Sequence, residues 1–156
     1  MKKILIFILL LTSLAQASSK EEILKNIESL IKSNGINSMM EKFIAKEQTE
    51  YPKKMNTLDT VTGVFYINMT KAKVYRHQLN PKWRTIVKGK NNISIKQVEK
   101  FLPELMQKQA INTACSVDLD KLYLKYGVKI IHRYSEQDGT YLFETIVKKS
   151  SCISKK

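Results

Sequence analysis

The side chains that could carry out chemistry in this sequence are few and far apart. The only histidines are His77 and His132, and no H-x-x-x-H or other dense ligand spacing occurs. A metal ion shared by the two would also need a carboxylate such as Asp59 or Glu144. We therefore predict no metal site and no cofactor, and we interpret His132 as a partly buried, hydrogen-bonded strand residue.

Signatures of catalysis are also missing. The five glycines are all separate, so no phosphate-binding loop can form, and neither G-x-S-x-G nor H-E-x-x-H occurs. Asp118 and Asp120 resemble a carboxylate pair, but at a helix start they are expected to cap the helix and oppose its dipole. We predict that the protein is not an enzyme. The alternative is a secreted hydrolase or toxin effector whose site is assembled from distant residues.

The first 17 residues have the pattern of a secretory signal peptide. Lysines at positions 2 and 3 precede the apolar run from Ile4 to Leu11, and Ala15-Gln16-Ala17 matches a small-x-small cleavage site. The alternative is an uncleaved anchor. We predict export to a bacterial periplasm or beyond, with residues 18–156 forming a single domain. No later apolar run reaches membrane length, so no transmembrane segment is expected after cleavage.

Two cysteines in an exported chain most simply form one disulfide, here between Cys115 and Cys152. In the chain-entropy picture, closing a loop of this length stabilises the fold by about 4 kcal/mol. A nucleophilic cysteine is the alternative, but no C-x-x-C motif occurs and both histidines are distant in sequence.

Positive charge is the most distinctive bulk property. The formal net charge is +13 at pH 7, which favours acidic proteins, anionic lipids or other anionic polymers as partners. Most of the cations are lysines, whereas planar phosphate recognition favours arginine. We expect a protein partner with an acidic surface and no nucleic-acid partner, and the sequence leaves the oligomeric state open.

A strip of basic and aromatic residues between positions 71 and 90 is the best candidate for a partner-binding surface. Such a strip could contact an acidic partner or an anionic polymer. A solvated edge strand, where lysines prevent strand–strand association without any ligand, is the interpretation that the sequence favours over it. The strip consists of Lys71, Lys73, Tyr75, Arg76, Lys82, Trp83, Arg84, Lys88 and Lys90.

Helical spacing dominates the first part of the chain and the segment before Cys115. Capping-box patterns begin at Ser19, Ser38 and Ser94, and each precedes an apolar stripe. The first helix is expected to stop at 34–35, the second at 51–52, and the third near 114 with a kink or break at Pro103. A short helix is expected over 118–126, with Gly127 as its cap. The segment 82–92 has the weakest pattern.

Two hairpins are predicted between these helices. The first joins 59–67 to a wetter strand over 73–79, with Gly63 as a bulge; one long bent strand is the alternative. In the second, a two-residue Asp138-Gly139 loop joins two apolar runs. That register pairs positions 134 with 143, 133 with 144, 132 with 145, 131 with 146 and 130 with 147.

These elements predict an α+β fold in the order α-α-β-β-α-(α)-β-β. We expect helices to pack on one face of a four-stranded antiparallel sheet, with one disulfide and with the order of the hairpins left open.

Several of these residues together resemble a recurring family of small exported bacterial proteins. The resemblance is carried by Thr57-Leu58-Asp59-Thr60-Val61, Cys115, Gly127-Val128, Tyr134, Asp138-Gly139 and Cys152. It covers about the last two-thirds of the chain after the signal peptide, and it implies the disulfide and a compact α+β fold but no activity. The segment Lys71–Lys90 is longer and more basic than in that pattern.

The function predicted from the sequence is that of a small, non-enzymatic periplasmic or secreted protein that binds through its surface. It would be an accessory factor of an envelope or secretion system, or an immunity or inhibitor protein. The alternatives are the hydrolase or toxin effector named above and an anionic-polymer-binding protein, whose binding would depend on salt.

Overall fold

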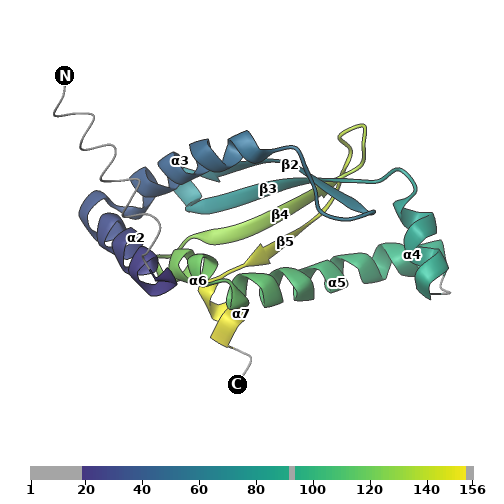
Figure 1. The fold of residues 1–156 in the computed structure, drawn as a ribbon. Coiled ribbons are helices and arrows are strands. Elements are labelled where there is room, and N and C mark those ends of the chain that lie inside the picture. The colour runs from purple at the N-terminus through teal and green to yellow at the C-terminus, as the bar shows by residue number, and fades with distance from the viewer. Residues whose placement is uncertain (1–18, 92–93, 154–156) are drawn as a thin grey trace. The chain divides into compact units, whose positions relative to one another are not determined.

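The computed structural model describes residues 19–91 and 94–153 (Figure 1). The predicted signal peptide, residues 1–17, lies outside the described residues. The chain divides after Gly35 into two compact units, residues 1–35 and 36–156. The expectation of one domain over 18–156 therefore stays a prediction. Within the described residues, no helix has the length and apolar character needed to cross a membrane.

The first unit contributes one described helix, α2 (Lys20–Asn34). It begins as predicted, because the Ser19 hydroxyl accepts a hydrogen bond from the Glu22 backbone N–H at 3.3 Å. It ends at Gly35, whose φ of 77° is a backbone conformation that glycine adopts without steric cost.

The second unit contains the sheet and the other helices. Its helical elements are α3 (Ile36–Glu47), η1 (Gln48–Glu50), η2 (Asn68–Thr70), α4 (Trp83–Asn91), α5 (Ile95–Ser116), α6 (Asp118–Lys125) and α7 (Lys149–Ile153). Its strands are β1 (Lys53–Lys54), β2 (Asp59–Ile67), β3 (Ala72–Leu79), β4 (Lys129–Ser135) and β5 (Tyr141–Val147). The α+β class is confirmed.

The sheet corrects the prediction of four antiparallel strands. Five strands lie in the order β1-β2-β3-β4-β5, and β3 pairs with β4 in parallel. The two hairpins are joined by α4, α5 and α6, which carry the chain from the end of β3 back to the start of β4, so the two strands run in the same direction (Figure 1). The sequence pattern predicts each hairpin but not the helical connection that makes β3 and β4 parallel. The two-residue β1 is too short to give a recognisable pattern.

The β4–β5 hairpin has the predicted register. Arg133 lies opposite Glu144, Tyr134 opposite Phe143, and the remaining pairs follow. The loop, however, has three residues, 137–139, because Glu136 N donates to Thr140 O at 2.8 Å. A turn closed by the Gly139 N–H on Glu136 O, followed by Gly139 at φ 90°, is the glycine-bulge connection typical of three-residue hairpin loops.

The β2–β3 hairpin is also confirmed, but β3 is not the wetter strand that was expected. Its register shifts at Gly63, as predicted for a bulge. Because β3 lies between β2 and β4, its backbone and most of its side chains are covered, and Lys73 is only 4% exposed. A central position in the sheet, which strand periodicity cannot show, makes this the most buried strand.

The helices differ from the predictions at three points. The second helix begins at Ile36, two residues before the predicted Ser38. Residues 83–91 of the weakly patterned segment form α4, whose Trp83 is 2% exposed. The Ser94 capping box is present, but the helix that follows is one helix of 22 residues with Pro103 inside it.

Helices α4, α5 and α6 pack on the same face of the sheet. One apolar cluster joins Leu79 and Tyr134 of the sheet to Trp83, Val87, Val98 and Leu102 of the helices. A second joins Ile130 and Val147 to Ala110, Ala114 and Leu124. The helices thereby cover the sheet face that carries the odd-numbered residues of β3, the even-numbered residues of β4 and positions 143, 145 and 147 of β5.

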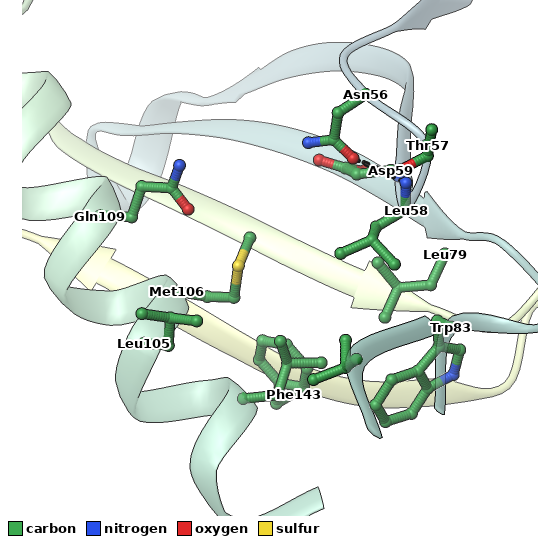
Figure 2. A pocket seen from close by; sticks show the side chains of 12 residues that line it. Asn56, Thr57, Leu58, Asp59, Leu79, Trp83, Leu105, Met106, Gln109 and Phe143 are labelled. Atoms are coloured by element: carbon green, nitrogen blue, oxygen red, sulfur yellow. Dashed lines mark hydrogen bonds between the residues drawn. The ribbon is translucent and has the colours of Figure 1, made fainter. Parts of the chain in front are cut away.

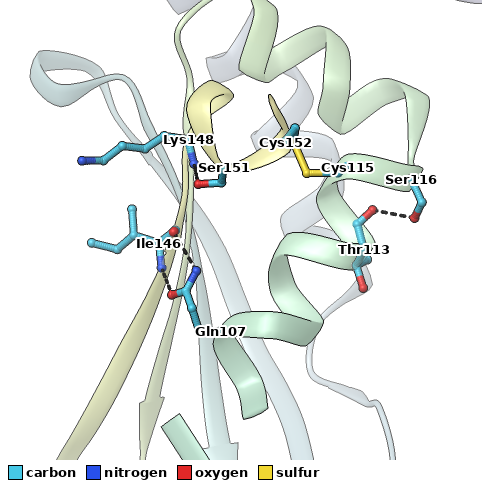
Figure 3. Close-up of a disulfide and its surroundings, with 8 residues drawn as sticks. All are labelled: Gln107, Thr113, Cys115, Ser116, Ile146, Lys148, Ser151 and Cys152. Carbon is cyan, nitrogen blue, oxygen red and sulfur yellow. Dashed lines mark hydrogen bonds between the residues drawn. A yellow bond between two sulfur atoms is a disulfide. The ribbon is translucent and has the colours of Figure 1, made fainter. Parts of the chain in front are cut away.

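The predicted disulfide is present between Cys115 at the end of α5 and Cys152 in α7, with the Cα atoms 5.5 Å apart (Figure 3). Nearby, the Gln107 side chain donates to Ile146 O and accepts from Ile146 N, each at 3.0 Å. These contacts attach α5 and the C-terminal end of the chain to β5, the last strand of the sheet.

Candidate functional site

An apolar pocket of about 350 Å³ lies between α4, α5 and the ends of β2, β3 and β5 (Figure 2). Met106 of α5 and Leu58 of the loop before β2 face it from opposite sides (Figure 2). The lining residues are Asn56, Thr57, Leu58, Asp59, Leu79, Trp83, Val87, Leu102, Leu105, Met106, Gln109 and Phe143. We call this site the apolar pocket.

The helical wall of the apolar pocket follows directly from the spacing of α5. Leu102, Leu105, Met106 and Gln109 recur at intervals of three and four residues and therefore share one side of the helix. Leu102 is 5% exposed and anchors the helix, whereas Leu105 is 42% exposed. The outer rim of the pocket is therefore apolar and accessible, which suits it to binding an apolar side chain from another molecule.

The opposite wall is a loop fixed by side-chain hydrogen bonds. Asn56 Oδ1 accepts from the backbone N–H of Leu58 at 2.7 Å and of Asp59 at 3.0 Å. Asn80 N donates to Leu58 O at 2.8 Å, which ties this loop to the end of β3. These bonds hold Leu58 and Thr57 in place without any ligand.

A charged cluster holds α4 beside the pocket. The Trp83 indole N–H donates to the Glu136 carboxylate at 3.2 Å, and Arg84 Nη1 donates to the same carboxylate at 2.7 Å. Arg84 also bonds Glu99 of α5 at 2.8 Å. The two carboxylates raise the pKa of Arg84 further, so α4 is attached to the β4–β5 loop and α5 by a permanent cation.

A buried chain of hydrogen bonds begins at Asp59, which lines the apolar pocket. Asp59 is 7% exposed, and its Oδ2 lies 2.8 Å from His77 Nδ1. His77 Nε2 lies 2.9 Å from Nδ1 of His132. In the first contact the His77 ring N–H donates to a carboxylate oxygen. In the second contact one ring nitrogen donates to the other, and the tautomers of the two rings set the direction.

Burial keeps the second histidine of this chain neutral. Loss of solvation, then the nearby charges of His77 and Lys73, lower the pKa of His132 to about 3. The Tyr75 ring stacks on His132 with a centroid distance of 5.0 Å, and the Tyr134 ring stacks on His77 at 4.5 Å. Desolvation and then the Asp59 charge raise the pKa of Tyr134 above its ordinary value, so this phenol also stays neutral.

A second, partly buried cluster surrounds Glu47 of α3, whose side chain is 25% exposed. Its carboxylate pairs with Lys73 Nζ at 2.8 Å and accepts from the Tyr75 hydroxyl at 3.1 Å and the Tyr51 hydroxyl at 3.2 Å. Burial is the main cause that raises the pKa of both phenols, and it also raises that of the nearby Asp120 carboxyl. This cluster anchors α3 to the central strand.

Neither buried cluster has the parts of a metal centre. The structure brings His77, His132 and Asp59 together, but the Asp59 oxygens face the His77 ring nitrogen. Glu144 lies on the opposite face of the sheet, opposite Arg133. Within residues 19–91 and 94–153, no group of three or more His, Cys, Asp or Glu side chains is arranged to hold a metal ion.

The predicted basic and aromatic strip is dispersed over several environments. Lys73 is buried against Glu47, Tyr75 is half-buried, and Trp83 is 2% exposed. Arg76 is exposed on the sheet face opposite α4 and α5, whereas Arg84 bonds Glu99 and Glu136. Lys71, Lys82 and Lys88 are exposed, and the Lys90 side chain lies outside the described residues. Partner binding by this strip stays a prediction, and its members do not share one surface.

The sequence did not reveal the apolar pocket or the His77–His132 contact. The contact needs β3 and β4 side by side, and the parallel pairing of Tyr75 with His132 was not predictable from either hairpin alone. One signal did exist for the pocket: Thr57, Leu58 and Asp59 belong to the pattern that carries the resemblance described above, and all three line it. Asp118 and Asp120 lie in the first turn of α6 as expected, but Val117 is the N-cap and no side chain caps it.

No protein-family model and no curated protein matches the chain. Solved structures do match. A candidate secreted protein of Pseudomonas aeruginosa superposes with a TM-score of 0.58 at 13% identity, covering 74% of this chain and 91% of its own. The type 2 secretion system pilotin EpsS of Vibrio vulnificus superposes with a TM-score of 0.54 at 12% identity, covering 82% and 96%. At these identities the likeness establishes a shared fold alone.

Proposed function

We propose that this protein is a non-enzymatic, exported accessory factor of a secretion system that binds a protein partner through the apolar pocket. The observation that carries the proposal is the accessible apolar rim at Leu105, above a pocket whose walls are already fixed. A preformed apolar site with few polar groups is typical of ligand recognition. The absence of a catalytic signature from the sequence favours binding over turnover.

The shared fold supports the accessory role over the immunity or inhibitor role. One of the matching structures is a pilotin of a type 2 secretion system, and another is a candidate secreted protein. Both agree with the export predicted from residues 1–17. Membership of the family of small exported proteins that the sequence resembles remains part of this proposal.

The α5 helix offers a matched pair of positions for the test. Leu105 and Phe101 are 42% and 43% exposed on the same helix, but only Leu105 lines the apolar pocket. A photoreactive amino acid at position 105 is expected to crosslink a discrete partner in the cell envelope, whereas one at position 101 is not. Equal crosslinking from both positions, or crosslinking from position 101 alone, would contradict the proposal.

The identified partner then allows a quantitative test. Leu105→Glu is expected to weaken its binding about tenfold or more, because burial of a leucine contributes about 1.5–3 kcal/mol and 1.4 kcal/mol corresponds to a factor of ten. Phe101→Glu adds the same charge one turn away and is expected to change the affinity less than about twofold. Equal losses would show that α5 is not the binding surface.

A second candidate function is the hydrolase or toxin effector, favoured by one observation. The Asp59–His77 contact has the geometry of a carboxylate that orients a histidine base. His77 Nε2, however, contacts His132 at 2.9 Å rather than a nucleophile. Turnover of a broad panel of ester, peptide and glycoside substrates that disappears with His77→Asn would favour this alternative over the binding function.

A further inference from the structure

We propose that a hollow on the sheet face opposite α4 and α5 binds a phosphate group between Arg76 and Arg133. The hollow has a volume of about 330 Å³, and both arginines line it. This site is independent of the apolar pocket, so the proposed partner binding and this proposal can fail separately.

The parallel pairing of β3 and β4 places two positive charges side by side. Arg76 and Arg133 are register partners and project from the same face of neighbouring strands. Like charges at directly opposed strand positions are destabilising unless an anion neutralises them. The arrangement is therefore unfavourable for the sheet itself and favourable for an anionic ligand.

The protein supplies little negative charge of its own here. Within the described residues Arg76 has no ion pair, and its guanidinium lies 5.7 Å from the Phe65 ring centroid. Arg133 reaches one oxygen of Glu144 at 3.3 Å, and the two side chains are 47% and 30% exposed. A long, exposed pair of this kind contributes about 1 kcal/mol or less, so a dianion can compete with it.

The remaining lining groups suit an oxyanion. None of the lining residues is acidic. The Thr62 and Ser135 hydroxyls and the Gln78 amide already donate to backbone carbonyls, so the donors left for a ligand are the two guanidinium groups and the Tyr141 hydroxyl. Guanidinium groups bind phosphate through paired hydrogen bonds, and a phosphate carries up to two charges where a carboxylate carries one. The charge of two arginines therefore favours phosphate over a carboxylate.

The backbone at Gly63 keeps space for the Arg76 side chain. A Cβ atom at this position would lie 3.1 Å from Arg76 Nη2 and 3.1 Å from Gln48 Nε2, closer than an ordinary contact. Glycine at the Val61/Gly63 bulge therefore leaves room beside β2 for both side chains. A larger residue at position 63 would require these side chains to shift by a few tenths of an ångström.

The first test is a titration of the full exported chain with inorganic phosphate at constant ionic strength, followed by NMR of the arginine side-chain Nε–H signals. Saturable shifts are expected at Arg76 and Arg133 but not at Arg84, whose guanidinium is bonded to Glu99 and Glu136. Equal shifts at all three arginines, the same shifts with chloride, or no saturation would overturn the proposal.

Variants make the test specific. Arg76→Lys and Arg133→Lys keep the charge but remove the fork, and each is expected to weaken phosphate binding about tenfold, the scale of one charged hydrogen bond. Lys88→Gln removes one exposed positive charge elsewhere and is expected to change the affinity less than about twofold. A loss with Lys88→Gln that equals the others would show attraction by net charge alone.

Binding to lipid vesicles shows whether the phosphate belongs to a lipid headgroup or to a soluble molecule. Co-sedimentation with phosphatidic acid vesicles, but not phosphatidylcholine vesicles, that Arg76→Gln abolishes would assign a lipid headgroup. Binding of inorganic phosphate without co-sedimentation would assign a soluble phosphate or small ester. Co-sedimentation that Arg76→Gln and Arg133→Gln leave unchanged would show that the lipid binds elsewhere and would overturn the lipid assignment.

Discussion

The two hairpins of the sheet differ in where their charged side chains lie: on an exposed face in one and in the interior in the other. In β4–β5 the cation and anion, Arg133 and Glu144, lie across from each other on an exposed face. In β2–β3 the charges of Asp59 and Lys73 point into the interior, where Lys73 meets Glu47 of α3. Both hairpins have polar contacts to a helix, but β5 makes its contact to Gln107 of α5 through the Ile146 backbone, whereas β3 makes its contact to α3 through a buried charged side chain.

This difference determines how strongly the stability of each hairpin responds when one charged residue is replaced. An exposed ion pair contributes little to stability, because when one partner is removed the other stays solvated. A buried pair contributes little net energy as a whole, but removing one partner strands a charge in the interior. The β2–β3 hairpin is therefore expected to be intolerant of single changes, whereas β4–β5 depends on its apolar pairs and on the disulfide that encloses it.

The largest loss of stability is expected when the disulfide that encloses the β4–β5 hairpin is removed. The double variant Cys115→Ala/Cys152→Ala is expected to lower the free energy of unfolding by about 4 kcal/mol, because the unfolded chain regains the freedom of a 37-residue loop. Urea denaturation followed by circular dichroism measures the change. Reductant is expected to destabilise the parent protein by a similar amount and to leave the variant unaffected. If the variant is as stable as the parent, the ring does not support the β4–β5 hairpin.

Breaking the buried pair is expected to be next in size. Lys73→Met leaves the Glu47 carboxylate, whose side chain is 25% exposed, without its cation and is expected to cost about 2 kcal/mol in denaturant unfolding. The control is Lys73→Met/Glu47→Gln, in which no charge is stranded, and it is expected to recover most of the loss. A double variant no more stable than the single one would show that packing of the Lys73 stem, and not its charge, is what matters.

His132, which contacts His77, is expected to make the free energy of unfolding depend on pH. The pKa of His132 is about 3 in the folded protein and about 6.5 in the unfolded chain. As pH falls from about 6.5 towards 3, the unfolded state gains the proton first, so stability falls by up to about 1.4 kcal/mol per pH unit. Burial raises the pKa of Asp120, and this carboxyl acts in the opposite direction.

His132→Asn isolates this contribution, since the asparagine amide can still form a hydrogen bond as donor or acceptor but does not titrate. Between pH 6.5 and 5, where most carboxylates stay ionised, stability measured by urea unfolding is expected to fall more steeply in the parent than in His132→Asn. Identical slopes would contradict the lowered pKa of His132.

The smallest effect is expected in the exposed pair. Arg133→Met is expected to change the free energy of unfolding by less than about 1 kcal/mol, since both partners keep contact with water. Thermal unfolding beside Lys73→Met gives a direct contrast, because the same residue replaces a strand cation on each hairpin. Equal losses in the two variants would remove the distinction between the hairpins.

Local patterns predicted the local structure of this chain. Asp138-Gly139 between two β-branched runs gives the β4–β5 register, and the Ser94 capping box gives the start of α5. Long-range pairing was not predictable, because the β3–β4 contact depends on how 80–128 folds between them. The same limit explains the basic strip: alternation shows that Lys73 and Arg76 point to opposite faces, but not which face α3 covers.

The double hydrogen bond between Gln107 and Ile146 also affects how the sheet ends. The amide occupies the N–H and C=O of one residue on β5 in the way that another strand would. A sheet edge with free backbone groups invites pairing with other chains and aggregation. Gln107 thus acts as a one-residue substitute for a neighbouring strand, and it blocks growth of the sheet at that point of its outer edge (Figure 3).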